Sequence, residues 1–163
     1  MVMVQEYLRR RGAPFEVVDH PSAFTSIAEA FAVGISADEV LKCVVLDTRG
    51  GHALGVVPAS TRLDMDLVQE ALRDPAACLA TERELDADLD VELGAMPPTG
   101  WLFGLPTFVD PAVFEHETIL FAAGSRTLSI RMRTEDLFRD EPYTVAPLTA
   151  RRESEDRRKE LIR

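Results

Sequence analysis

The stretch DEVLKCVVLD, residues 38–47, places a lysine in the middle of an apolar run. The run is short and rich in valine and leucine, which is typical of a buried β-strand. Side chains alternate between the two faces of a strand, so Lys42 shares a face with Val40, Val44 and Leu46. A lysine among aliphatic groups needs a partner, a route to water along its own stem, or a cavity. The stretch therefore predicts either an edge strand with a solvated ammonium or a pocket beside the strand.

The residues around this strand predict a fold that mixes strands and helices. The turn TRGG (48–51) follows the strand, and HALGVVPAS (52–60) can return beside it as a hairpin. A second hairpin is expected around Gly124 and Ser125, and further strands are expected at 14–20 and 107–110. Helical periodicity and end signals predict helices at 4–12, 22–34, 62–74, 81–89 and 133–140, the last with Thr134 as its cap.

Strands and helices do not alternate strictly, which favours an α/β domain of the α+β type. We expect a single domain with a mixed, largely antiparallel curved sheet flanked by helices, over residues 1–149. Residues 150–163 are dominated by charge, and we expect a tail that is helical or frayed.

Composition limits the classes of function. The chain has 163 residues and a formal net charge of −10, which argues against a general nucleic-acid binder but allows contact through one small patch. No apolar run approaches the length of a membrane span, and the N-terminus lacks the order of a signal peptide, so we expect a cytoplasmic location. Cys43 and Cys78 lie in apolar neighbourhoods and are expected to be reduced core thiols.

Several common active-site motifs are absent from the sequence. The three histidines are far apart and have no cysteine or histidine at metal-ligand spacing, so we expect no metal and no cofactor. The sequence also contains neither a phosphate-binding loop nor a Gly-x-Ser-x-Gly nucleophile elbow.

One further segment has the chemistry of a binding site. GAMPPTG, residues 94–100, brackets two prolines with glycines, which predicts a stiff bend with free backbone N–H groups at Gly94, Ala95 and Met96. Such a bend is either a rigid structural turn or a set of donors that stabilises a developing oxyanion.

These segments also carry a resemblance. TSIAEAFAVGISADEVLKCVVLD, VVPASTRLD, LGAMPPTG and FEHETILFAAGSRTLSI together resemble, in this order, the YbaK/prolyl-tRNA-synthetase editing-domain family. The similarity runs from about Phe15 to Leu137, and its most specific elements are Lys42 and the Gly-x-x-x-Pro loop from Gly94 to Pro98. It implies a mixed α/β domain that hydrolyses the ester between a wrong amino acid and a tRNA. The implied partner is therefore misacylated tRNA.

The resemblance also implies roles for individual residues. Lys42 would hold the 3′-terminal nucleotide or the aminoacyl carbonyl, and the loop that begins at Gly94 would contact the aminoacyl group through its backbone. These two residues are the catalytic candidates. A water, or the substrate's own hydroxyl or thiol, would attack. The implied substrate-binding residues are His20 and Thr25 at the mouth of the pocket, Ala95, Met96, Pro98 and Gly100 in the loop, and Gly124 and Ser129 near the pocket.

The implied function answers the question that Lys42 raises. A synthetase pocket rejects a smaller amino acid by only ~1–3 kcal/mol per methylene, so a second site has to remove wrong products. Such a site needs a small apolar cup and a cation, and a lysine on a valine-rich strand supplies both.

Two positions depart from the family pattern. Cys43 follows the lysine where many members have threonine, and Val18 stands where some have tyrosine, so the resemblance does not specify the amino acid removed. Because nothing in the sequence resembles a synthetase catalytic domain, we expect a free-standing deacylase that acts in trans. The alternative is a non-catalytic module of the same fold that binds tRNA, a nucleotide or a protein.

Overall fold

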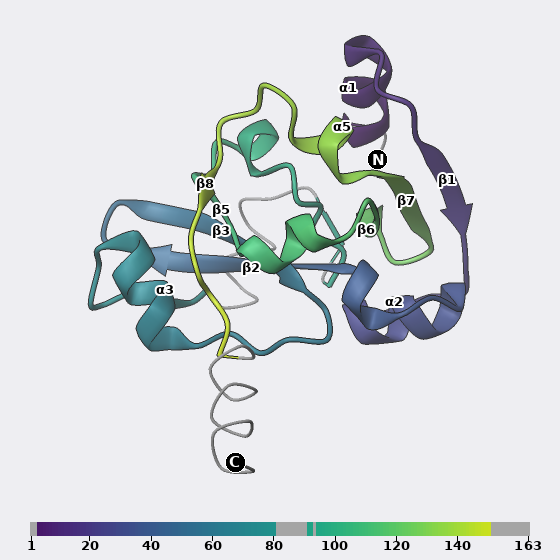
Figure 1. The fold of residues 1–163 in the computed structure, drawn as a ribbon. Coiled ribbons are helices and arrows are strands. Elements are labelled where there is room, and N and C mark those ends of the chain that lie inside the picture. Colours follow the sequence, from purple (N-terminus) through teal and green to yellow (C-terminus); the bar gives the residue numbers. More distant parts are fainter. Residues whose placement is uncertain (1–2, 81–90, 93, 151–163) are drawn as a thin grey trace.

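Strands from both halves of the chain interleave in two β-sheets (Figure 1). The computed structural model describes residues 3–80, 91–92 and 94–150. The first sheet has the strand order β1 (Glu16–Asp19), β7 (Leu128–Arg133) and β6 (Thr118–Ser125). The second has the order β4 (Cys78–Leu79), β2 (Leu41–Thr48), β3 (Gly51–Pro58), β5 (Thr107–Val109) and β8 (Thr144–Val145). The α-helices of the described residues are α1 (Met3–Arg11), α2 (Ser26–Val33), α3 (Met65–Leu72) and α5 (Thr134–Phe138).

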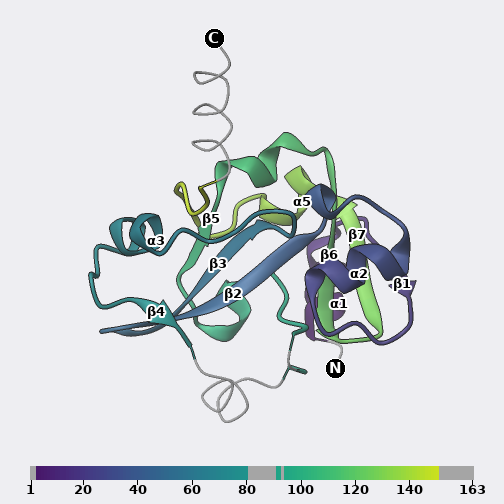
Figure 2. The ribbon, with the colours of Figure 1, turned by 90° about the horizontal axis from the view of Figure 1, so that it is seen from below.

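The lysine strand β2 lies in the second sheet, and the residue before it connects this sheet to the first. β2 and β3 form the expected antiparallel hairpin, with Lys42 opposite Val57 and Thr48 opposite Gly51. Just before β2 begins, Val40 pairs with Leu120 of β6 in an isolated bridge. Figure 2 shows the hairpin running from β4 toward α2 and β6. The expected mixed α/β fold is confirmed, with its strands divided between two sheets.

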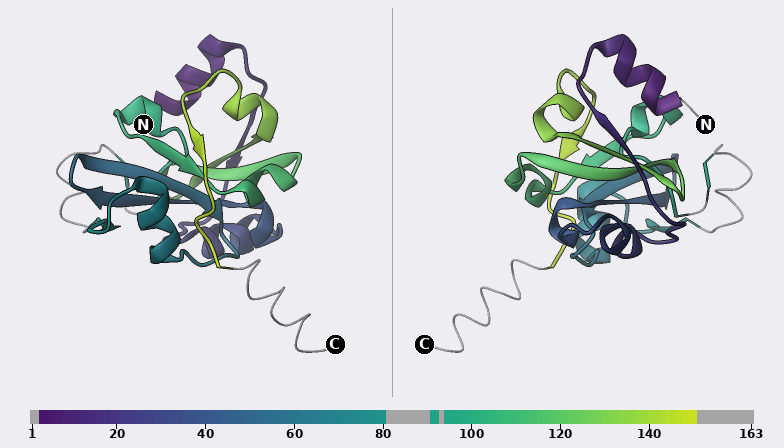
Figure 3. Two further views of the ribbon diagram at one scale, coloured as in Figure 1. Left: turned by 60° about the vertical axis from the view of Figure 1, so that its left-hand side comes forward. Right: turned by 90° about the vertical axis from the view of Figure 1, so that its right-hand side faces the viewer.

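The first sheet is covered on both faces by helices. Figure 3 shows α1 and α2 on opposite sides of it. On the α1 side, Leu8 packs in the main core cluster with Phe121 and Ile130. On the α2 side, Ala30 packs in a smaller cluster with Leu120. Alternate residues of β6 therefore serve two different cores, as the period of a strand requires.

The second sheet is also buried on both faces. Val45 of β2 contributes to the main core cluster, whereas Leu46 packs with Val68 of α3. Val44 packs on the α3 side as well. The predicted alternation therefore holds: Lys42 lies on the face of β2 that carries α3.

The helix ends differ in detail from the expectations. α2 begins at Ser26 rather than Ser22, because the Thr25 side chain accepts the Ala28 N–H at 3.0 Å and caps the helix. Thr134 was expected to cap the last helix, and this is wrong: Arg133 occupies the cap position, and the Thr134 hydroxyl donates to the His116 carbonyl.

Other expectations have mixed outcomes. Cys78 is exposed on the short strand β4 and is not a core thiol, whereas Cys43 packs against the main core cluster. The expected helix at 81–89 and the charged tail from residue 151 lie outside the described residues. Within the described part of the chain, none of the helices is long and apolar enough to cross a membrane.

Gly100 provides a test of the close packing between the 94–100 segment and β5. The residue is buried, and an added methyl group would overlap the Thr107 hydroxyl and lie 3.0 Å from the Leu105 carbonyl oxygen. We expect Gly100→Ala to lower the free energy of unfolding by about 1–3 kcal/mol, measured by urea denaturation, because overpacking forces backbone shifts. Gly50→Ala is the matched control, since Gly50 is exposed and meets only the Thr48 side chain at 4.0 Å. Equal stability of the two variants would contradict this account.

Candidate active site

A small recess lies between the start of α2, the loop at Gly94 and the turn that joins β6 to β7. The space between its wall atoms, open solvent included, is about 160 Å³, and in this structure it has no room for a water-sized sphere. It is therefore a narrow dimple that has to widen before it can hold a chemical group of a substrate. Its walls are formed by His20, Ala23, Thr25, Glu29, Gly94, Ala122, Ser125 and Arg126.

The loop at Gly94 is held against two other segments. Gly94 has φ +81°, and a side chain there would overlap the carbonyl oxygen of Phe24, so only glycine allows this approach. The Ala95 carbonyl accepts the Gly124 N–H at 3.0 Å, and the Gly124 carbonyl accepts the Glu92 N–H at 3.0 Å. The loop is thus tied to β6 on one side and to the approach to α2 on the other.

The backbone donors of this loop are not all available to a substrate. The Ala95 N–H donates to the Glu92 carbonyl at 3.0 Å, so the expectation that it is free is wrong. Ala95, Pro98 and Gly100 are buried, and Met96 packs against the main core cluster. Of the 94–100 residues proposed to bind substrate, only Gly94 lines the recess, and the roles of the others remain predictions.

Three polar side chains form a chain of hydrogen bonds at the recess. His20 Nε2 lies 2.7 Å from the Ser129 hydroxyl, and that hydroxyl also contacts a carboxyl oxygen of Glu29. Glu29 is 3% exposed, and Ser129 is fully buried. Burial raises the pKa of Glu29 from 4.5 to about 7, and the hydrogen bond from Ser129 only partly opposes this. The structure therefore brings the predicted residues His20 and Ser129 into direct contact, and it adds Glu29, which the sequence did not single out, as the second partner of Ser129.

Aromatic side chains are exposed beside the recess. Phe24 and Phe31 of the α2 region are 61% and 89% exposed, and the Arg126 guanidinium stacks on the Phe24 ring at 4.3 Å. The backbone N–H of Arg126 donates to a Glu92 carboxyl oxygen at 2.8 Å. A hollow of about 720 Å³ runs along this outer face of α2 and shares Thr25 with the recess.

Lys42 lies outside the walls of the recess. Its ammonium donates to the Thr61 carbonyl at 2.7 Å. Burial lowers the pKa of Lys42, and the nearby Arg62 guanidinium lowers it further. Lys42 is half-buried and shares its face with Val44, so it is neither an exposed edge lysine nor a wall of the recess. Its predicted contact with a substrate remains a prediction.

Cys43, on the opposite face of β2, turns toward the recess side of the domain. Burial raises the pKa of the Cys43 thiol well above its usual value, and the nearby Glu29 carboxyl adds to this effect. The thiol therefore stays protonated at neutral pH, which disfavours a role as a nucleophile.

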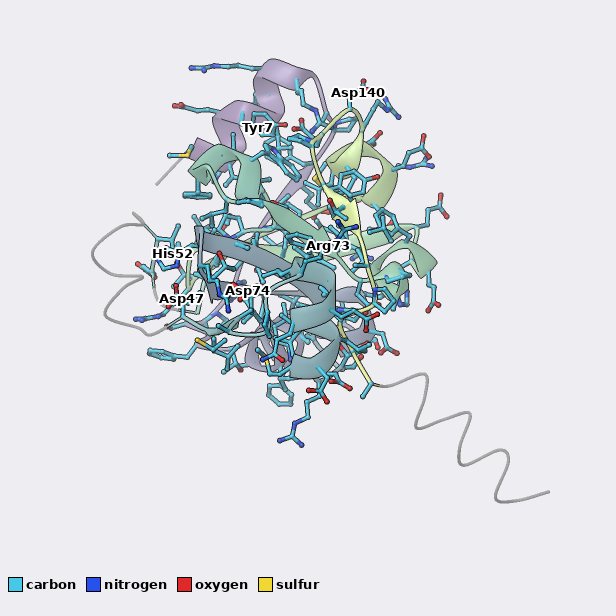
Figure 4. The ribbon with its side chains drawn as sticks, turned by 90° about the vertical axis from the view of Figure 1, so that its left-hand side faces the viewer. Tyr7, Asp47, His52, Arg73, Asp74 and Asp140 are labelled. Carbon is cyan, nitrogen blue, oxygen red and sulfur yellow. The ribbon has the colours of Figure 1, made fainter. Side chains whose placement is uncertain are left out.

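Two larger hollows lie elsewhere and contain none of the predicted site residues. One, of about 600 Å³, lies at the turn end of the β2–β3 hairpin beside α3. Figure 4 shows Asp47, His52 and Asp74 close together there, with Arg73 on the same side. The other, of about 500 Å³, is lined by α5 and includes Arg139 and Tyr143.

Glu29 should make the stability of the protein depend on pH. Because its pKa is about 7 in the folded state and 4.5 in the reference state, the folded protein holds the proton more tightly. The stabilisation is fully present below pH 4.5 and is lost as pH rises toward about 7. We expect the free energy of unfolding of the wild type to fall by about 3 kcal/mol over this window relative to Glu29→Gln, measured by urea denaturation. Parallel pH curves for the two proteins would show that the carboxyl is not perturbed.

Comparison with known proteins places this geometry in a family. The family described as "Aminoacyl-tRNA editing domain" matches residues 20–139, a range that contains every wall residue of the recess. The chain is 25% identical over 118 residues to EbsC of Enterococcus faecalis (strain ATCC 700802 / V583), which is named as a candidate Cys-tRNA(Pro)/Cys-tRNA(Cys) deacylase. This alignment covers 72% of this chain and 70% of that protein.

Solved structures agree with the match. A crystal structure of a candidate trans-editing enzyme for prolyl-tRNA synthetase is 26% identical, with a TM-score of 0.78 over 90% of this chain and 94% of that one. The hypothetical protein APE2540 shares the fold at 20% identity, with a TM-score of 0.81 over 90% of this chain and 98% of that one. Since the family match spans well over half of the sequence, this chain belongs to the aminoacyl-tRNA editing domain family.

Proposed function

We propose that the protein is a free-standing aminoacyl-tRNA deacylase, which acts in trans and hydrolyses the ester bond of a mischarged tRNA. The observation that carries this proposal is the recess at Gly94, whose wall combines a rigid loop with His20 and the buried Glu29. The family match and the relative named as a candidate deacylase support the same chemistry. A cytoplasmic location, where tRNA is charged, is part of the proposal.

The recess suits attack by a water or by a group of the substrate itself. The recess is narrow and would widen to take the ester carbonyl and a water, and Ala23 and Ala122 give it an apolar side. The Cys43 thiol is held protonated, and Ser129 is fully buried within its hydrogen bonds, so neither is placed as a protein nucleophile. The proposed reaction needs no metal and no cofactor.

The surface beside the recess suits the single-stranded end of a tRNA. Bases stack on exposed aromatic rings and on guanidinium planes, and Phe24, Phe31 and Arg126 present such surfaces next to Thr25. The contact would be local, because the chain as a whole carries a net charge of −10. Arg133 at the end of β7 contributes less, since it is paired with Glu117 at 3.4 Å and with Glu135.

Lys42 is proposed to bind a phosphate of the tRNA end. Its ammonium has one carbonyl partner in Thr61, and Arg62 brings a second positive charge close to it. Two cations held near each other bind an anionic phosphate more strongly than they bind a neutral carbonyl group. This placement favours the nucleotide alternative of the sequence analysis over the carbonyl alternative.

The two alternatives for Lys42 predict different kinetics. If the ammonium binds phosphate, Lys42→Ala raises KM for the tRNA, lowers the salt dependence of binding by about one unit, and leaves kcat nearly unchanged. If it contacts the aminoacyl carbonyl, kcat falls by about 10²–10³ at saturating tRNA. We expect the first result in steady-state deacylation at several salt concentrations. Arg139→Ala, which removes one positive charge in the hollow lined by α5, is the control.

The function itself is tested by single-turnover deacylation over a panel of tRNAs carrying correct and incorrect small amino acids. Cys-tRNA(Pro) belongs in the panel because the relative is named for it. We expect hydrolysis of at least one mischarged tRNA, and little hydrolysis of correctly charged ones. Saturable tRNA binding without hydrolysis of any panel member would instead support the non-catalytic binding module.

A further inference from the structure

The hydrogen bonds of His20 determine part of its protonation state. Its Nδ1 lies 2.8 Å from the carbonyl oxygen of Pro21. A carbonyl oxygen only accepts hydrogen bonds, so Nδ1 carries a proton. The other ring nitrogen, Nε2, therefore either accepts a proton from Ser129 or carries a second proton itself.

The number of protons that the other hydrogen bonds of His20, Ser129 and Glu29 require can be counted. Two hydrogen bonds link three groups: His20 Nε2 to the Ser129 hydroxyl, and that hydroxyl to a carboxyl oxygen of Glu29. Each bond needs one proton, but serine supplies only one. The second proton must come from one end of the chain of groups. Either His20 is an imidazolium facing a Glu29 carboxylate, or both ends are neutral with the proton on Glu29.

The two arrangements carry the same net charge and differ only in where one proton lies. Moving it requires a short shift of two protons through the Ser129 hydroxyl, with no movement of heavy atoms. The groups lie on three elements: His20 directly after β1, Glu29 on α2 and Ser129 on β7. Figure 1 shows these elements next to one another.

The surroundings favour keeping the proton within this set. Glu29 is 3% exposed, and an unshared negative charge there would be costly. The other titratable or charged groups near it are Cys43 from β2, whose thiol is held protonated, and Arg126, which lines the recess from the β6–β7 turn. The raised pKa of Glu29, about 7, agrees with a proton retained at neutral pH.

We propose that Glu29, Ser129 and His20 form a relay that holds one proton between its two ends, and that Glu29 is the group that takes the proton from the attacking water. This inference rests on the proposed deacylase function. It assigns Glu29 as a catalytic residue because Glu29 is among the residues that line the recess, and the attacking water reaches it when the recess widens. Ser129 and His20 are positioning residues that act through Glu29.

The relay explains how a buried carboxyl can act as a base and then as an acid. With the shared proton on His20, Glu29 is ionised and accepts a proton from water as the water oxygen bonds to the ester carbonyl carbon. Glu29, now protonated, gives that proton to the ribose oxygen as the bond between carbonyl carbon and ribose oxygen breaks. The amino acid is released and loses a proton to solvent, and the relay returns to its starting state.

The proton sharing is tested on the wild-type protein without reference to activity. NMR of ¹³C-labelled glutamate carboxyls and ¹⁵N-labelled imidazoles is recorded from about pH 4 to about pH 9. If one proton is shared, the signals of Glu29 and His20 change together at common midpoints. In Ser129→Ala, which removes the linking hydroxyl, the two groups should titrate at separate midpoints. Independent titration of the two residues in the wild type would overturn the relay.

The catalytic role is tested with Glu29→Gln. The glutamine amide can donate to Ser129, whose hydroxyl then donates to His20, so the hydrogen bonds persist while proton transfer is lost. We expect single-turnover deacylation to fall by about 10²–10⁴-fold at neutral pH and its dependence on pH to flatten, with the fold retained in the NMR spectrum. Glu70→Gln, which removes the same charge from the exposed side of α3, should behave as wild type.

The outcomes separate the inference from the function on which it rests. If Glu29→Gln deacylates at the wild-type rate, Glu29 is structural and the proposed step is wrong. If the wild type deacylates none of the panel, the deacylase function fails, while the common titration still decides whether the relay exists. If Glu29→Gln does not fold, the wild-type titration and the deacylation rate of Ser129→Ala test the proposal instead. We expect the deacylation rate of Ser129→Ala to fall as well.

Discussion

The arrangement of the site depends on one buried carboxyl group. Glu29 is almost fully buried, so its carboxyl has to be neutralised or hydrogen-bonded. Ser129 on β7 supplies the hydrogen-bond partner. This contact turns the Glu29 side of α2 toward the sheet. The opposite side of the helix then points outward, which leaves Phe31 exposed beside the recess. One polar contact thus positions both the proton-carrying groups and the aromatic surface.

Glycine residues also shape the site, because they allow two backbone segments to approach each other where a side chain would not fit. Gly94 lies directly against the carbonyl of Phe24 and has a positive φ angle, which a residue with a Cβ rarely adopts. Gly124 is hydrogen-bonded to Ala95 at the bulge of β6. The recess therefore has a wall made of rigid backbone, which suits a site that positions a small ester group for attack.

Local patterns in the sequence were enough to predict most of the secondary structure. The turn TRGG between two strand-like segments predicted the β2–β3 hairpin. The alternation around Lys42 predicted the face on which the lysine lies, because a strand has a strict period of two. The helical spacing of Phe24, Ile27 and Phe31 identified α2, but these residues are exposed. The spacing of apolar residues shows that a helix has an apolar and a polar face. Which face is buried depends on the segments that pack against the helix, and these are distant in sequence.

By itself, the sequence determined the mixed α/β class and the family, and it named His20, Gly94 and Ser129 as candidates, since each depends on local spacing or on motifs that can be compared. Only the tertiary structure decided how these residues meet. Glu29 and Ser129 are 100 positions apart, and His20 and Ser129 are 109 apart, so no local pattern could reveal their contacts. Lys42 lies outside the recess because β2 turns alternate side chains toward different cores. The site is a product of long-range packing, and its chemistry follows from the burial that this packing imposes.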